Sequence, residues 1–253
     1  MDKQVQTINS LSRGLMILDI IHEHGSIGVT ELSKILEVNK SSAYRLLKTL
    51  EENGYVEQIG EGGKYALGLK LCKFRERVLD RYEIRAIAHP FLEELNRITG
   101  EAAGLSVRKG DLIYLIDCLS SPQYLGVILQ VGDREELHST AHGKAMFASM
   151  PEDEKLRLLK TVPREKHTAN TIIGEEELLE EAKRNRERGY AIDEEETTLG
   201  MRCVAAPVFD FSGQVVAAIG ISGPVDRVRK EMIPRYAETV CQIAEKISRK
   251  LGY

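Results

Sequence analysis

The sequence predicts an α+β protein with two domains. Residues 7–68 show three helical patterns followed by two short strand-like runs, and a long helical stretch then leads into mixed strands and helices. The length of 253 residues allows one or two domains, and 42% apolar with 29% charged residues is typical of a globular protein with a core. We therefore expect domains over 1–68 and 81–253, joined by a linker helix over 69–80.

The first domain begins with a helix that is expected between Ser10, a candidate N-cap, and His24. Gly25 should end it. Apolar residues recur at helical spacing along this stretch: Leu11, Leu15, Leu18 and Ile21. We expect them to form one face of the helix.

A second, short helix is expected over 29–36, with Thr30 as its N-cap. The third begins near Asn39, where Asn39 or the serines after it can cap it. Its apolar stripe has the spacing i, i+3, i+4, i+7: Ala43, Leu46, Leu47 and Leu50. Two strand-like runs within 55–68 flank "GEGG", whose glycines can take positive φ in a hairpin. Three helices and a hairpin in this order make a winged helix-turn-helix.

The second domain is expected to contain an antiparallel sheet together with helices. Strand pairs should turn at Lys109-Gly110 and at Ser212-Gly213, and another strand is expected at 125–131. Pro90 should begin a helix or kink one. The other helical patterns fall in four stretches: 139–150, 152–160, 174–189 and 232–251.

The third helix carries polar and basic residues away from its apolar stripe. Ser41, Arg45 and Lys48 share one face because they are four and seven residues apart. A helix that enters the major groove of DNA needs short hydrogen-bond donors near its N-terminus and long cations that reach base edges or phosphates. The candidate DNA-binding residues lie on this helix and on the hairpin: Lys40, Ser41, Ser42, Tyr44, Arg45, Lys48 and Lys64.

The overall charge does not favour nucleic acid, because the formal net charge is -4 and basic and acidic residues nearly balance within 1–70. A charged outer face on one helix is often only solvated. The short second helix, the tight connection and the hairpin favour DNA here. Binding must then depend on the local placement of cations, and we expect modest affinity per half-site and a need for dimers.

These motifs resemble the IclR family of bacterial transcriptional regulators over nearly the whole chain. The segments that carry the resemblance are 39–57, 64–71, 137–148, 188–196 and 200–228. The resemblance implies a winged helix, a linker helix and a GAF-like α/β effector-binding domain. It also implies double-stranded operator DNA as a partner, a homodimer through the N-terminal domains that can form a homotetramer, and a small organic acid or aromatic compound as effector.

The same resemblance implies where the effector lies. The backbone around residues 141 and 142 would face it, and a turn before a helix offers free N–H groups to a carboxylate. Within the acidic run "DEEE", the first residue is expected to line the cavity and the others to form a solvated turn. The candidate effector-binding residues are Ala141, His142, Asp193, Met201, Cys203 and Ser222. Gly220 stands where some members have a serine, so that hydroxyl donor is missing here.

Two other functions stay open on the sequence. Cys203 with His138 or His142 would suit a small-molecule hydrolase, although the apolar run around Cys203 argues against a strained nucleophile turn. A ligand-free architectural DNA-binding protein is the second alternative. The same three side chains could in principle hold a metal, but the ligand set is incomplete, and we expect no metal.

No known catalytic or cofactor motif is present: the hydrolase elbow, the zinc-protease helix and the dinucleotide fingerprint are all absent. We therefore expect neither an enzyme nor a cofactor. The cysteines are widely spaced without a C-x-x-C pair, which favours a reduced, cytoplasmic setting. Asp19 interrupts the N-terminal apolar run, so neither a signal peptide nor a membrane span is predicted.

Overall fold

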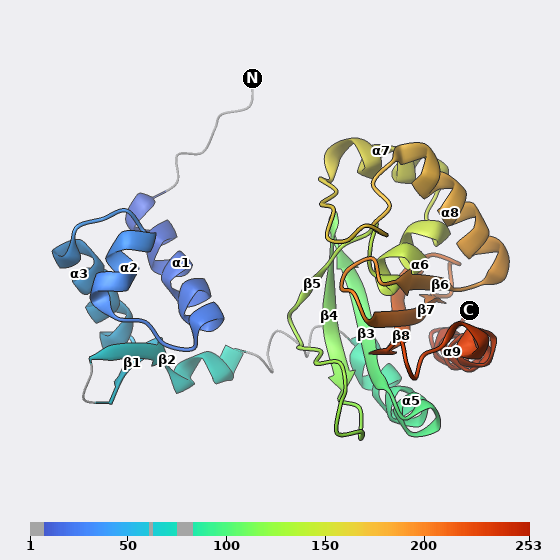
Figure 1. The fold of residues 1–253 in the computed structure, drawn as a ribbon, viewed down its shortest axis with the longest axis horizontal. Coiled ribbons are helices and arrows are strands. Elements are labelled where there is room, and N and C mark those ends of the chain that lie inside the picture. The colour runs from blue at the N-terminus through green and yellow to red at the C-terminus, as the bar shows by residue number, and fades with distance from the viewer. Residues whose placement is uncertain (1–7, 61–62, 75–82) are drawn as a thin grey trace. The chain divides into compact units, whose positions relative to one another are not determined.

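The computed structural model describes residues 8–60, 63–74 and 83–253. The chain divides into two compact units, Met1–Arg81 and Tyr82–Tyr253 (Figure 1). The N-terminal unit has the predicted order of three helices and a hairpin. Its elements are α1 (Asn9–His24), α2 (Val29–Ile35), α3 (Lys40–Glu52), β1 (Val56–Ile59), β2 (Lys64–Leu67) and a 3-10 turn (Leu69–Leu71).

The core of this unit lies where the three helices meet the hairpin. Its fully buried side chains come from all three helices and from β2: Ile17, Ile21, Leu32, Ala43, Leu47 and Tyr65. The backbone of Tyr65 also bridges to Ile27, which ties β2 to the segment between α1 and α2. This packing holds α3 by its apolar side and leaves its polar side outward.

Three local predictions for this unit need correction. Ser10 does not cap α1, because the helix begins at Asn9 and Ile8 is at its N-cap position. The expected apolar face of α1 is buried only in its second half: Ile21 is fully buried and Leu18 packs on the core, but Leu11 and Leu15 are 61% and 57% exposed. The buried residues of α1 are Ile17, Ile20 and Ile21, which have the spacing i, i+3, i+4 on a neighbouring face. Both faces of this helix are apolar, so the spacing alone does not decide which one is buried. Thr30 does not cap α2, which begins at Val29 without a side-chain cap.

The C-terminal unit is built on a six-stranded antiparallel sheet in the order β5-β4-β3-β8-β7-β6. Its strands are β3 (Ala102–Lys109), β4 (Leu112–Leu119), β5 (Arg134–Glu135), β6 (Ala191–Glu194), β7 (Met201–Phe209) and β8 (Val215–Pro224). Its helices are α5 (Glu83–Thr99), α6 (Ala141–Ser149), α7 (Glu152–Thr161), α8 (Glu175–Arg188) and α9 (Ile233–Lys250), with a 3-10 turn at Lys230–Met232.

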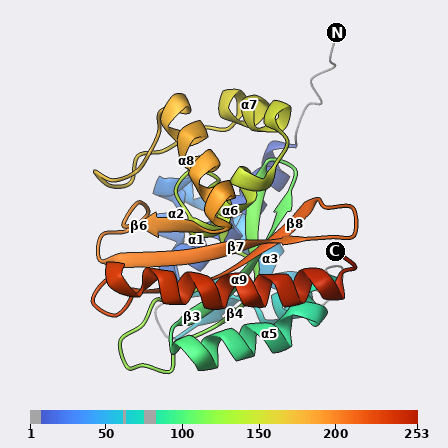
Figure 2. The same ribbon diagram turned by 90° about the vertical axis from the view of Figure 1, so that its right-hand side faces the viewer.

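Helices cover both faces of this sheet. Helices α5 and α9 pack against each other and on strands β3 and β7, whereas α6 packs on β7 and β8 with α8 against it (Figure 2). Residues 202–206 of β7 are consecutively buried, as expected for a strand that is covered on both sides. The predicted two-domain α+β class with an antiparallel sheet is confirmed.

Three predictions for the second domain need correction. Residues 125–131 form no strand, because residues 132–135 already occupy the open edge of β4 at Ile113–Leu115. Strand β6 was not predicted, since its acidic sequence gives no apolar pattern. Of the two alternatives for Pro90, a helix start is wrong, because Pro90 lies inside α5.

The predicted linker helix over 69–80 is described only in part. Residues 69–71 form the 3-10 turn, residues 72–74 are helical, and residues 75–80 lie outside the described residues. Among the described helices, none is both long and apolar enough to cross a bilayer.

Candidate functional sites

Helix α3 is fixed at its start by its own cap. The Asn39 side chain accepts hydrogen bonds from the Ser42 amide at 2.8 Å and from the Ser41 hydroxyl at 2.7 Å. Ala43 and Leu47 are fully buried beneath it. The serines therefore stabilise the first turn of the helix, and this turn is the part that a groove-reading helix presents to DNA.

The candidate DNA-binding residues differ in their exposure to solvent. The exposed ones are Lys40, Ser41, Tyr44, Arg45 and Lys64, and the half-buried ones are Ser42 and Lys48. Arg45 forms no ion pair within the described part of the chain. Lys48 instead bonds Glu51 at 2.5 Å, and this hydrogen bond raises the pKa of Lys48. Arg45 is thus the freer cation for a nucleic-acid partner.

In the C-terminal unit, three candidate effector-binding residues stand in one row across the sheet. Asp193 pairs with Cys203, and Cys203 pairs with Ser222, on strands β6, β7 and β8. Residues directly opposite each other on paired strands point to the same face, and all three are at most 6% exposed. Met201 is half-buried two residues before Cys203.

This row lies under the start of α6, which carries the other two candidates. The charge of Glu135 acts on Cys203, and the charge of Lys144 acts on Asp193. Thr140 caps α6 by accepting from the Gly143 amide at 3.0 Å. The first-turn amides of Ala141 and His142 have no backbone partner among the described residues, as is usual at a helix start.

Gly220 has no room for a side chain. A Cβ there would lie 2.6 Å from the Val204 carbonyl oxygen and 2.7 Å from the Ala205 Cβ. The missing hydroxyl donor is therefore a consequence of close strand packing in this sheet.

His142 is buried between two hydrogen-bond acceptors. Its Nδ1 lies 3.0 Å from Glu135 Oε1, and its Nε2 lies 3.1 Å from the Gly104 carbonyl oxygen. Only the imidazolium donates from both nitrogens. Burial by itself lowers the pKa of His142, but the charge and hydrogen bond of Glu135 together with the Gly104 carbonyl outweigh burial and raise it. The two acceptors and the raised pKa both favour the imidazolium form of His142 beside the candidate effector site.

We expect this pair to make stability depend on pH. Below the ordinary histidine pKa of about 6.5 the ion pair contributes fully, and its contribution is lost as the pH rises through the raised pKa of folded His142. His142→Gln should cost about 3 kcal/mol near neutral pH, because it leaves Glu135 buried without its partner.

Urea unfolding at a series of pH values tests this expectation. As the pH rises from about 6.5 through the raised pKa of folded His142, the variant should lose less stability than the wild type. The difference between the two proteins isolates His142 from the other histidines. An equal pH dependence in both would contradict the assignment.

The Asp193 carboxylate accepts its hydrogen bonds from the turn that directly follows it in the chain. Its Oδ1 accepts from the Glu196 amide at 2.7 Å and from the Thr197 amide at 3.3 Å, and its Oδ2 accepts from the Thr197 hydroxyl. Burial raises the pKa of Asp193, although these bonds and Lys144 oppose the shift. The carboxylate thus shapes the wall of the site around Glu195, whose φ is positive.

Sequence reasoning missed a buried ionic network next to this turn. Lys144 bonds Glu196 and lies 3.5 Å from Glu181, and Lys144 and Glu196 are each 3% exposed. The expected solvated turn after Asp193 is wrong, because Glu196 is buried and Glu194 pairs with Arg202. The local sequence around Lys144, a Gly-Lys dipeptide at 143–144, does not by itself predict a buried ion pair.

The hydrolase alternative does not fit this geometry. Burial raises the pKa of the Cys203 thiol well above its ordinary value, and the charge of Asp193 adds to the shift. Cys203 therefore stays a protonated thiol at neutral pH, whereas a cysteine nucleophile needs a lowered pKa. Neither His138 nor His142 is hydrogen-bonded to it among the described residues.

The metal set considered from the sequence is not brought together either. His138 precedes α6, so it does not share a helix face with His142. Its Nε2 lies 2.9 Å from the Glu165 carbonyl oxygen, and burial lowers its pKa. Among the described residues, the group that could hold a metal contains Glu136, His138 and His167, with neither His142 nor Cys203.

Comparisons with known proteins agree over both units. Residues 10–60 match the IclR helix-turn-helix domain, and residues 76–249 match the family described as bacterial transcriptional regulator IclR C-terminal. The HTH-type transcriptional regulator KdgR of Escherichia coli is 37% identical over 253 residues, which cover 100% of this chain and 96% of KdgR.

The chain is also similar to a repressor and to a protein of known crystal structure. The transcriptional repressor IclR of E. coli is 31% identical over 248 residues, covering 97% of this chain and 90% of the repressor. The crystal structure of Thermotoga maritima IclR is 36% identical and superposes with a TM-score of 0.81, covering 98% of this chain and 100% of that one. A three-helix unit with an exposed cationic helix, followed by a sheet with a buried polar row, therefore places this chain in the IclR family of bacterial transcriptional regulators.

Proposed function

We propose that this IclR-family regulator represses transcription by binding a pseudo-palindromic operator as a homodimer or a dimer of dimers. A small organic acid bound in the C-terminal unit changes its operator affinity. As a regulator of bacterial transcription it acts on DNA in the cytoplasm.

The observation that carries the proposal is the exposed face of α3. The helix is held by buried Ala43 and Leu47, while Lys40, Tyr44 and Arg45 remain exposed. Phosphate contacts by such cations supply sequence-independent affinity, and base contacts from the first turns supply specificity. The names of the relatives, which include repressors, support the direction of the regulation.

The dimer is supported by an apolar stripe that α1 leaves uncovered. Its residues are spaced along one side of the helix and are 50–67% exposed: Ile8, Leu11, Leu15 and Met16. A contiguous exposed apolar face is typical of a protein–protein interface. Two copies joined there would carry two α3 helices toward successive major grooves.

An acidic effector is supported by the surroundings of the α6 start. The positive end of a helix favours a carboxylate, and so do the first-turn amides of Ala141 and His142, which have no backbone partner among the described residues. The Cys203 thiol and the Ser222 hydroxyl can orient the rest of a small molecule. An equilibrium between two states with different effector affinity would link this site to the operator.

Binding to the DNA upstream of the chain's own coding region tests the function. Fluorescence anisotropy at several salt concentrations should show tight binding that weakens with salt and exceeds binding to scrambled DNA. A panel of small carboxylates should contain at least one that shifts this affinity. A protein that binds both DNAs equally at every salt concentration would contradict the proposal.

Ser222→Ala is expected to weaken the effector response and to leave operator affinity unchanged. Loss of one hydrogen bond to a charged ligand costs about 1.5–3 kcal/mol, or roughly 10- to 150-fold in effector affinity. Calorimetry with the active carboxylate, beside anisotropy without it, separates the two effects. A parallel loss of DNA binding would show that Ser222 supports the fold rather than the ligand.

A further inference from the structure

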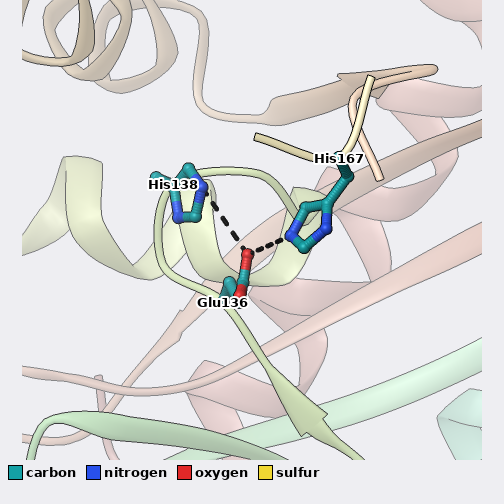
Figure 3. A group of neighbouring side chains, drawn as sticks. All are labelled: Glu136, His138 and His167. Atoms are coloured by element: carbon teal, nitrogen blue, oxygen red, sulfur yellow. Dashed lines mark hydrogen bonds and ion pairs between the residues drawn. The ribbon is translucent and has the colours of Figure 1, made fainter. Parts of the chain in front are cut away.

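Two histidines and a glutamate converge at the edge of the C-terminal unit. Glu136 and His138 flank Leu137 in the segment between β5 and α6, and His167 belongs to the irregular segment that joins α7 to α8 (Figure 3). The two imidazoles lie on either side of the carboxylate. The three residues thus join segments that are distant in the sequence.

We propose that Glu136, His138 and His167 form a binding site for Zn²⁺ or a similar divalent transition metal. Two imidazoles and one carboxylate are ligands of a kind that zinc sites commonly use, and imidazole favours Zn, Cu or Ni over Mg and Ca. Three protein ligands leave one tetrahedral position open. The site does not depend on the DNA-binding function or on the identity of the effector.

The distances suit this assignment. Glu136 Oε2 lies 2.7 Å from His167 Nε2 and 3.6 Å from His138 Nε2, and one ligand atom from each residue lies within 4.8 Å of the others. Ligand atoms of tetrahedral zinc are about 3.4 Å apart, as follows from zinc–ligand bonds of about 2.1 Å. Small side-chain rotations therefore suffice to place one ion among the three atoms.

Surrounding contacts orient two of the ligands. The buried Ser139 hydroxyl donates to Glu136 Oε2 at 3.0 Å. Thr171 Oγ1 accepts from the His167 amide at 3.1 Å and donates to the Glu196 carbonyl at 2.6 Å. Such outer contacts fix ligand orientation in metal sites. Zinc would replace the proton that His138 now directs to the Glu165 carbonyl.

The site also has a route for an ion. The side chains of Glu136 and His167 are 30% and 28% exposed, whereas that of His138 is 4% exposed. A surface hollow of about 330 Å³ opens beside them, lined by Arg134, Glu136, Pro163 and Glu165. A bound ion would fasten the α7–α8 segment to the start of α6.

Zinc titration of the chelator-treated full-length protein tests the site. Calorimetry should give one Zn²⁺ per chain, and Co²⁺ should give the visible absorption of a tetrahedral complex. Removal of an outer-shell partner commonly weakens a site 10- to 100-fold. His167→Ala and Glu136→Gln should therefore each weaken Zn²⁺ binding by at least about 100-fold, and Ser139→Ala by about 10-fold.

The control is His22→Ala, which removes an exposed histidine of α1 and should leave zinc binding unchanged. His167 is partly exposed on an irregular segment, so its replacement should not disturb folding, and circular dichroism checks this. Absence of zinc binding by the wild type would overturn the proposal. Equal binding by wild type and His167→Ala, or loss in His22→Ala, would overturn it as well.

Discussion

Gly143→Ala is expected to unfold the C-terminal unit or to destabilise it by at least about 3 kcal/mol. A Cβ at this position would lie 2.0 Å from the Glu136 carbonyl oxygen and 2.8 Å from the Leu137 Cα. Both neighbours are backbone atoms, so no side chain can rotate away. The Glu136 carbonyl is also held by the Thr140 hydroxyl at 2.9 Å.

The relief of this clash would require α6 to move away from the preceding segment. Eight of its residues are buried, so any shift disturbs the packing on the sheet. Urea unfolding followed by circular dichroism measures the loss, and the fraction of soluble protein reports it if the variant does not fold. A cost below about 1 kcal/mol would mean that the segment before α6 yields easily.

Gly14→Ala is the matched control for this substitution. Gly14 lies inside α1, and nothing lies within 4 Å of an added Cβ there. Alanine in a helix interior is favoured over glycine by roughly 0.5–1 kcal/mol. The control should therefore stabilise its unit slightly, which would separate the steric effect at position 143 from the effect of the exchange itself.

Arg45→Ala is expected to weaken operator binding by about 1–3 kcal/mol, or roughly 5- to 150-fold. Arg45 is exposed on α3 and forms no ion pair among the described residues, so its charge is available to DNA. Anisotropy with the upstream DNA measures the loss, and calorimetry with the effector should show no change. If both affinities fall together, the division of functions between the two units is wrong.

Two comparisons sharpen this result. Lys48→Ala should cost less than Arg45→Ala, because Glu51 already binds Lys48 in the free protein. Lys183→Ala removes an exposed cation from α8 in the other unit and should leave operator binding unchanged. An equal loss in all three variants would indicate a general charge effect rather than a specific contact.

The order of elements in the N-terminal unit, and most helices of the C-terminal unit, followed from the sequence, because they depend on local signals. Asn39 before an apolar i, i+3, i+4, i+7 stripe marked α3, and its cap is the one observed. Gly60 and Gly63 in the hairpin, and Gly189 after α8, take the positive φ that their positions require. Helix caps, turns and apolar periodicity depend on residues that are close together in the chain, so they can be predicted from one sequence.

Errors arose wherever a residue's role depends on distant partners. Leu11 and Leu15 have the spacing of a core stripe, yet the rest of the unit packs on the neighbouring face of α1. Residues 125–131 have the composition of a strand but lack a free edge to pair with. The acidic strand β6 has no local signal, because its polar side chains are buried by residues far along the chain.

The sequence by itself determined the family and the fold class, and it predicted which helix faces DNA and which strand residues surround a ligand site. Tertiary structure alone decided that Asp193, Cys203 and Ser222 form one row, that His142 is buried between Glu135 and the Gly104 carbonyl, and that His138 meets His167 rather than Cys203. The reason is physical: helix and turn preferences are set by neighbouring residues, whereas charge, burial and ligand geometry are set by side chains that only the folded chain brings within a few ångströms of one another.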